Sequence, residues 1–319
     1  MKQAGKTVLV TGGCGYVGSI LVGDLLAQGY SIRIIDLQWF GNYLSDHPQL
    51  QVRAGDIRDI HESELKGLDA IIHLANVAND PGVELDPTLS WEINGLGSQQ
   101  LADKAVRAGV PHFIYASSGS VYGVKSEPNV TEDLPLDPIS VYNKTKMVAE
   151  RAILSYGDEM TVHCVRPATV CGYSPRMRLD VSVNILTMQA FKNGKMTVFG
   201  GAQVRPNIHI DDMSRVYSHF LKNADLPSGS YNAGFENISI LDIAEIIASK
   251  VKSEIVVSES NDPRSYRQNS DKLLASGFAP SKTVSIAVDE MLEKWSDGTL
   301  SDNENWSTVR KMKSLGIGK

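Results

Sequence analysis

The 319-residue chain lacks the features that mark several classes of protein. It has only three cysteines, Cys14, Cys164 and Cys171, an odd number without metal-ligand spacing. No apolar stretch approaches the length of a membrane span, and residues 1–6 run straight into an apolar segment, which leaves no room for a signal peptide. We therefore expect a protein of the reducing cytoplasm that holds no metal and enters no membrane.

Positive charge is not concentrated anywhere along the chain. The formal net charge is −6 and the lysines and arginines are scattered, which argues against a nucleic acid or an anionic membrane as partner. Hydrophobic residues make up 42% of the chain and charged residues 21%, which is the balance of a soluble globular protein.

Apolar runs alternate with amphipathic helical patterns over the first half of the chain. We predict strands near 6–11, 31–36, 50–54, 69–74, 112–117 and 160–166, and helices near 16–29, 88–109 and 140–157. This alternation predicts an α/β fold, a Rossmann-type doubly wound parallel sheet with a smaller mixed α/β substrate-binding lobe. We assign residues 1–172 and 208–234 to the NAD-binding domain and residues 173–207 and 235–319 to the lobe. The polar tail after Gly298 is expected to pack loosely or on a neighbouring subunit.

A glycine-rich turn follows the first predicted strand. Gly12 permits the tight turn, Gly15 lets the backbone approach a pyrophosphate, and Gly18 lets the next helix pack close to the sheet. The N-terminus of that helix offers free N–H groups and a positive dipole end to the phosphates. The second predicted strand ends in Asp36, whose carboxylate can accept hydrogen bonds from ribose hydroxyls and would repel a 2′-phosphate. The turn and Asp36 therefore favour NAD over NADP as cofactor.

A Tyr-x-x-x-Lys pair lies downstream of a serine pair. Tyr142 and Lys146 are four residues apart and share one face of the predicted helix. A free phenol has a pKa near 10, and a neighbouring ammonium and a cationic nicotinamide should both lower it. Tyr142 can then take the proton from a hydroxyl whose carbon gives hydride to the cofactor, while Ser118 steadies the same oxygen. Lys146 would also hold the nicotinamide ribose.

These motifs resemble the extended branch of the short-chain dehydrogenase/reductase superfamily, whose members act on nucleotide sugars. The likeness rests on the Gly-x-x-Gly-x-x-Gly spacing and on segments 56–57, 74–75, 117–123, 166–172 and 205–212, in family order. Asn76 replaces an alanine of the family pattern. The resemblance implies NAD contacts from Gly12, Gly15, Tyr16, Val17, Gly18, Asp36, Asp56, Ile57, Leu74, Ala75, Asn76, Ser117, Tyr142, Lys146 and Pro167.

The same resemblance implies a nucleoside-diphosphate sugar bound between the domain and the lobe. A diphosphate needs cationic partners, so Arg205 and Arg264 are the first candidates, with Arg176 behind them. The alternative is that these arginines are ordinary solvated charges. Thr169 stands where the family has an asparagine that helps to hold the diphosphate. The expected substrate contacts are Ser118, Gly119, Ser120, Tyr142, Thr169, Arg176, Arg205 and Arg264.

The residues after Ser118 select the reaction. Family members that dehydrate or decarboxylate their sugar carry an acidic residue at this point, whereas Gly119 and Ser120 cannot exchange a proton at neutral pH. That leaves oxidation of the C4 hydroxyl, either by a 4-epimerase that returns the hydride or by a 4-dehydrogenase that releases a keto sugar. We expect the epimerase, the commoner activity among similar proteins.

Two other classes stay open. A non-catalytic NAD-binding regulatory protein would usually have lost the tyrosine or the lysine, and this chain keeps both. A small-molecule reductase without a nucleotide handle is disfavoured by the arginines.

The helix expected at 88–109 is more apolar than one sheet-facing side requires. Its apolar residues are Leu89, Ile93, Leu96, Leu101, Ala105 and Val106. In similar proteins this helix and the one at 140–157 pair with those of a twofold mate, so we predict a homodimer or a dimer of dimers; the alternative is that all six residues are core.

Overall fold

The structure is a computed structural model that describes residues 5–259 and 265–318. Its centre is a seven-stranded sheet in the order β10-β6-β5-β4-β1-β2-β3, with every pairing parallel. The strands are β1 (Thr7–Thr11), β2 (Ser31–Asp36), β3 (Leu50–Ala54), β4 (Ala70–His73), β5 (His112–Ala116), β6 (Thr161–Pro167) and β10 (Gly229–Ala233). The predicted Rossmann-type sheet is thus confirmed, and its strand order reverses between β1 and β4, where such sheets bind ligands.

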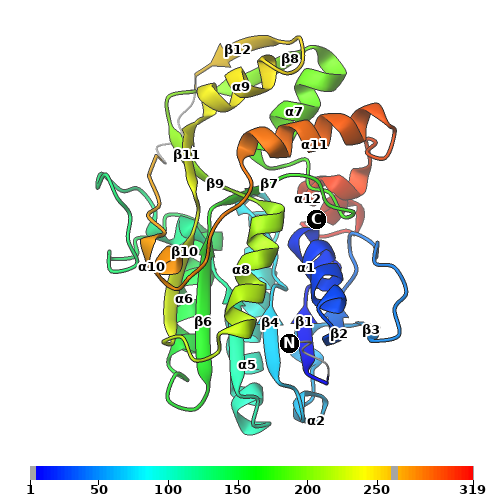
Figure 1. The fold of residues 1–319 in the computed structure, drawn as a ribbon, viewed down its shortest axis with the longest axis vertical. Helices are drawn as coiled ribbons and strands as arrows, with labels where there is room; N and C mark the ends of the chain where they lie inside the picture. Colours follow the sequence, from blue (N-terminus) through cyan, green and yellow to red (C-terminus); the bar gives the residue numbers. More distant parts are fainter. Residues whose placement is uncertain (1–4, 260–264, 319) are drawn as a thin grey trace.

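Helices cover both faces of this sheet. Alternate residues of a strand point to opposite faces, so Val8 and Val10 of β1 pack on one side and Leu9 on the other. The first side is covered by α1 (Tyr16–Ala27) and α8 (Ile210–Lys222), which lie next to each other in Figure 1. The second side is covered by α5 (Ser98–Arg107) and α6 (Val141–Leu154). No helix in the described ranges is long and apolar enough to cross a membrane.

A second group of elements lies beyond the carboxyl ends of the main strands, at the top of Figure 1. Strands β7 (Thr169–Cys171), β9 (Val204–His209) and β11 (Glu236–Ser239) form one small sheet, and β8 (Lys195–Phe199) pairs with β12 (Glu254–Ser258). They pack with α7 (Ser182–Asn193), α9 (Ile240–Ala248) and α11 (Val284–Ser296) around a separate apolar core. Of the segment 208–234, which we expected to return to the main sheet, only β10 joins it. The boundaries of domain and lobe stay a prediction.

The helix expected at 88–109 is built from three consecutive pieces. They are α4 (Pro87–Ser90), the π-helix η2 (Trp91–Gly97) and α5. Within η2 the buried side chain of Asn94 accepts a hydrogen bond from the main-chain N–H of Val77 and donates one to its carbonyl. This pairing fastens the wide turn to the loop that follows β4.

Seven short elements complete the described fold. They are η1 (Ile57–Asp59), α2 (Glu62–Leu65), α3 (Asp80–Val83), η3 (Gly119–Tyr122), α10 (Asp271–Ala275), η4 (Glu304–Trp306) and α12 (Thr308–Ser314).

The tail after Gly298 packs within the chain, so the first of its two expected arrangements, loose packing, was wrong. Trp306 of η4 and Met312 of α12 are buried in two different apolar cores of the same chain. The ring of Trp306 lies 5.2 Å from that of Tyr43, and the main-chain N–H of Leu179 donates to the Trp306 carbonyl. These contacts bring the tail to the second group of elements and to the edge of the main sheet.

A buried ion pair ties α6 to the main sheet. The Glu150 carboxylate, 1% exposed, contacts Arg166 Nη2 at 2.5 Å and accepts hydrogen bonds from the hydroxyls of Ser117 at 2.5 Å and Ser230 at 2.9 Å. Arg166 also donates to the Tyr122 hydroxyl at 2.6 Å. Removing one partner of a buried pair leaves the other charge uncompensated, so the network is costly to break.

Glu150→Ala is therefore expected to lower the free energy of unfolding by about 3–5 kcal/mol. Urea unfolding followed by circular dichroism would measure the loss. The matched control is Lys192→Ala, which removes a partner from the exposed ion pair with Asp302 and should cost about 0–1 kcal/mol. Equal losses in the two variants would contradict the importance given to the buried pair.

Candidate active site

The glycine turn between β1 and α1 has the close approaches that its sequence predicts. Gly12 has a φ of +73°, and a Cβ there would lie 2.6 Å from the main-chain nitrogen of Ala75. A Cβ on Gly18 would lie 2.5 Å from the Gly12 carbonyl oxygen. No side chain caps the N-terminus of α1 at Gly15, so its first N–H groups are available to an anion.

Asp36 ends β2 beside this turn. Its carboxylate accepts hydrogen bonds from the main-chain N–H groups of Cys14 at 3.0 Å and Gln38 at 2.7 Å, and burial raises its pKa. Asp56, at the end of the next strand, holds the guanidinium of Arg58 at 2.8 Å. Burial acts to raise the pKa of Asp56, but the hydrogen bonds and charge of Arg58 outweigh burial and keep this pKa below its usual value.

A single cavity of about 590 Å³ joins these residues to the serine and tyrosine segments. This volume suits a cofactor or a drug-sized ligand. Of the predicted site residues, those that line it are Gly12, Gly15, Tyr16, Val17, Gly18, Asp36, Asp56, Ile57, Leu74, Ala75, Asn76, Ser117, Ser118, Ser120, Tyr142, Lys146, Pro167, Thr169, Arg176 and Arg205. Gly119 is buried beside the wall, where a Cβ would lie 3.0 Å from the Pro167 carbonyl, and Arg264 lies outside the described residues.

Tyr142 and Lys146 both reach the cavity from α6, which begins after the N-cap Ser140. Lys146 is 2% exposed; its ammonium donates to the Ala116 carbonyl at 2.8 Å, and burial lowers its pKa to about 7. The Ser118 hydroxyl lies 2.7 Å from that of Ser120, and Ser118 is near enough to Tyr142 to lower its pKa.

The pKa of Tyr142 corrects one expectation. Burial raises it to about 12; the charge of Arg178 and the Ser118 side chain act in the opposite direction, and Asp80 adds to the rise. Within the chain, the cation that favours the Tyr142 phenolate is therefore Arg178, whereas we expected Lys146 to act together with the cationic nicotinamide of the bound cofactor. The reason is that Lys146 extends from the shared helix face to the carbonyl of β5 instead of the phenol.

Arg178 and its neighbours are functional candidates that the sequence analysis missed. Arg178 donates to Asp180 at 2.9 Å through Nε and lines the cavity, while its Nη2 is buried without a hydrogen-bond partner. Asp180 also accepts from the main-chain N–H of Thr308 at 3.0 Å and from Asn79 at 3.1 Å. The missed signal was the Arg-x-Arg-x-Asp pattern directly after the turn at Gly172.

The C-terminal tail closes one wall of the cavity. Thr308, Val309 and Met312 of α12 line it. None of them stands out in the sequence, because α12 is short and its contacts depend on the tertiary fold.

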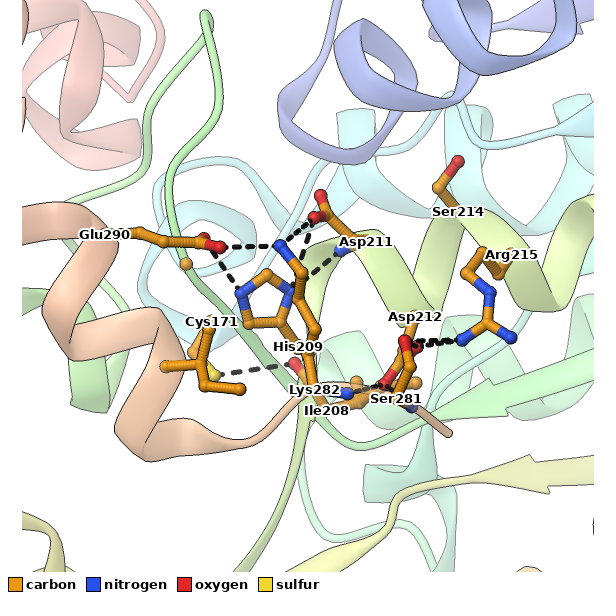
Figure 2. A network of polar contacts seen from close by, with 12 residues as sticks. Cys171, Ile208, His209, Asp211, Asp212, Ser214, Arg215, Ser281, Lys282 and Glu290 are labelled. Carbon is orange, nitrogen blue, oxygen red and sulfur yellow. Dashed lines mark hydrogen bonds and ion pairs between the residues drawn. The ribbon is translucent and has the colours of Figure 1, made fainter. Parts of the chain in front are cut away.

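Figure 2 shows a polar cluster outside the cavity lining. His209, Asp211 and Glu290 could hold a metal ion by their spacing. However, the Lys282 ammonium lies 2.6 Å from both Asp211 Oδ2 and Glu290 Oε1, so a cation already stands between the carboxylates. The cluster connects the start of α8 to α11, and we assign it no ligand.

The sequence profile of the NAD dependent epimerase/dehydratase family matches residues 8–234. The chain belongs to this family. Membership confirms the predicted family resemblance and NAD as the cofactor. The glycine turn, the uncapped N-terminus of α1 and Asp36 line the same cavity.

Relatives within and around the family carry several activities. The UDP-glucose 4-epimerase of Lactobacillus helveticus is 28% identical over 268 residues, which cover 75% of this chain and 80% of that protein. The uncharacterized protein y4nG of Sinorhizobium fredii is 35% identical over 214 residues. The human protein named sterol-4-alpha-carboxylate 3-dehydrogenase, decarboxylating, is 33% identical over 205 residues. The matched segments cover 66% and 61% of this chain but only about half of those two proteins, 52% and 51%.

Among solved structures, MoeE5 in complex with UDP-glucuronic acid and NAD superposes with a TM-score of 0.83. It is 25% identical, and the superposition covers 92% of this chain and 100% of that one.

Arg178→Gln tests whether the charge of Arg178 lowers the pKa of Tyr142. Removing the cation should raise the pKa of Tyr142, so the rise of kcat/KM with pH should move upward by roughly one pH unit. Arg178→Lys keeps the charge and should move the profile less. The measurement is the pH–rate profile on a substrate that the wild type turns over. A Gln variant whose profile coincides with that of the wild type would show that Arg178 does not act on the phenol.

Proposed function

We propose that the protein oxidises the C4 hydroxyl of a nucleoside-diphosphate sugar with NAD and is a 4-epimerase. The observation that carries the proposal is that Ser118, Tyr142 and Lys146 line the same cavity as the glycine turn. The 28% identity to a UDP-glucose 4-epimerase over three quarters of the chain supports it.

Each of the three side chains has a defined task in this proposal. When bound, NAD supplies the acceptor for the C4 hydride and, in an epimerase, returns it. Tyr142 accepts the proton of the C4 hydroxyl as a phenolate, which Arg178 and the cationic nicotinamide of bound NAD would favour against the effect of burial, and later gives the proton back. Ser118, oriented by its contact with the Ser120 hydroxyl, donates to the same oxygen. Lys146, held at the Ala116 carbonyl, keeps further N–H donors for the cofactor ribose.

The carboxylates of the cavity argue against dehydration, although the family includes dehydratases. Asp36 and Asp56 stand at the ends of β2 and β3, at the glycine-turn end. Although burial opposes it, Arg178 lowers the pKa of Asp180 to about 2, so it cannot donate a proton at neutral pH. Asp80 accepts a hydrogen bond from Ser140 at 2.5 Å. The two residues after Ser118 are Gly119 and Ser120, and neither can exchange a proton at neutral pH. Their identity supports a reaction at C4 alone.

Other reactions have specific support. A net 4-dehydrogenase would use the same three residues and differ in releasing its keto sugar. A sterol-type alcohol is favoured by the 33% identity to the human 3-dehydrogenase over 205 residues. We place it second because Arg178 and Arg205 line the cavity, and these cations suit a diphosphate better than a hydrocarbon.

Product analysis separates these reactions. The protein is incubated with NAD and a panel of nucleoside-diphosphate sugars chosen by thermal shift, since a bound ligand raises the melting temperature, and in parallel with NAD and a hydroxysterol. We expect an epimeric sugar without lasting NADH. Lasting NADH would select the dehydrogenase, and turnover of a sterol alone would overturn the nucleotide-sugar assignment.

Tyr142→Phe tests the base and separates an enzyme from an NAD-binding regulatory protein. The change removes the proton acceptor and keeps the ring, so turnover should fall by roughly two to four orders of magnitude. NAD affinity by calorimetry and the melting temperature serve as controls and should change little. Full activity of this variant would refute the mechanism.

We also propose that the protein is a homodimer or a dimer of dimers and works in the cytoplasm. Of the six apolar residues expected on the helix at 88–109, Ile93, Leu101 and Ala105 are buried within the chain. Leu96 is exposed, at 55%. It is joined by Trp91, 39% exposed on the same helix η2, and by Val148, 42% exposed on the adjoining α6. Exposed apolar side chains on neighbouring helices fit a contact with a second copy.

Sedimentation should therefore give at least twice the 34.8 kDa of one chain. Leu96→Glu should dissociate the assembly, because it places a charge in an apolar contact. Val124→Glu, a change of another exposed apolar residue on a different segment, is the control and should leave it intact. A lone 34.8 kDa species of the wild type at micromolar concentration would refute the proposal.

A further inference from the structure

Arg176 is a buried cation that forms no ion pair with any residue that the structure describes. It is 3% exposed, and its Nε has no hydrogen-bond partner. Within residues 5–259 and 265–318, no side chain forms an ion pair or hydrogen bond with its guanidinium, which lies 4.0 Å above the ring of Phe40.

This environment is costly for a charged group. Burying a charge without a partner is unfavourable. A guanidinium cannot avoid this cost by losing its proton, because it stays charged at neutral pH. Burial, and then the nearby charge of Arg178, lower the pKa of Arg176 only to about 9, so it remains a cation at neutral pH. A side chain of this kind is stabilised when an anion enters the cavity that it lines.

The surroundings of Arg176 belong to the half of the cavity next to the glycine turn. Besides Asp180, Asp36 at the end of β2 and Tyr16 at the start of α1 act on its charge. Phe40 follows β2 in the chain. Asp36 does not neutralise it by an ion pair, because its carboxylate accepts from two main-chain N–H groups instead.

The segment that carries Arg176 is fixed directly to the first residue of α1. The Tyr16 hydroxyl donates to the Gly172 carbonyl at 2.7 Å, and the Ser174 hydroxyl donates to the Tyr16 carbonyl at 2.8 Å. Asn184 of α7 donates to the same Tyr16 hydroxyl at 3.0 Å. Arg176, two residues after Ser174, is thereby placed relative to the N–H groups of the α1 N-terminus.

We infer that Arg176 binds a phosphate of NAD together with the α1 N-terminus, and does not bind the diphosphate of the sugar nucleotide. The cofactor would thus be held from both sides of the cavity, by main-chain N–H groups of the sheet domain and by one guanidinium of the segment after β7. The experiment below uses no sugar substrate, so its outcome is independent of the proposed reaction.

Binding of NAD, ADP-ribose, ADP, adenosine and UDP is measured by calorimetry on the wild type and on Arg176→Met, which keeps an unbranched apolar stem and removes the guanidinium. We expect NAD, ADP-ribose and ADP to bind roughly ten- to hundredfold more weakly, the range of a hydrogen bond to a charged group. Adenosine and UDP should be unaffected. Arg176→Lys, which keeps the charge without the planar fork, should lie between the two. Arg33→Met removes an exposed arginine of β2 and should change nothing.

The stability of the unliganded protein provides a second readout. Because Arg176→Met removes a buried charge that forms no ion pair within the described residues, its melting temperature should equal or exceed that of the wild type. A lower melting temperature together with weaker binding of adenosine would show a packing role over Phe40 and overturn the inference. Weaker UDP binding with unchanged ADP-ribose binding would assign the arginine to the sugar nucleotide and overturn it equally.

Discussion

The buried carboxylate of Glu150 holds the proposed reaction centre in place. It lies one turn after Lys146 and two turns after Tyr142 on α6, and it accepts from the Ser117 hydroxyl directly beside Ser118. Arg166 and Ser230 bring β6 and β10 to the same acceptor. Any movement of α6 relative to β5 would break these contacts, so a group outside the cavity wall fixes the distance between the proposed base and the serine that assists it.

Local rules made much of this molecule predictable. The glycines at positions 12 and 18 leave room that no other residue would leave, and the strand-helix alternation follows from the need to cover both faces of a parallel sheet. The lining of the cavity by the glycine turn, Asp36, Ser118, Tyr142 and Lys146 follows from strand order, because parallel strands end at one edge.

The remaining features depend on contacts between distant segments, which sequence spacing does not encode. Helical spacing places Tyr142 and Lys146 on one face, but it does not say that the lysine extends to β5 while Arg178 acts on the phenol. The π-helix around Asn94 forms because that side chain pairs with the main chain of Val77. The amphipathic pattern of residues 88–109 predicted one regular helix, because the pattern contains no sign of the contact between Asn94 and Val77.

The position of α12 bears on how this protein could acquire or change its selectivity. The family profile ends at residue 234, whereas Thr308, Val309 and Met312 form part of the cavity wall. The proposed proton-transfer residues thus lie within the part of the chain that the family profile matches, and part of the cavity wall lies beyond it. Directed evolution confined to residues 308–312 would therefore reshape the cavity while Ser118, Tyr142 and Lys146 keep their positions.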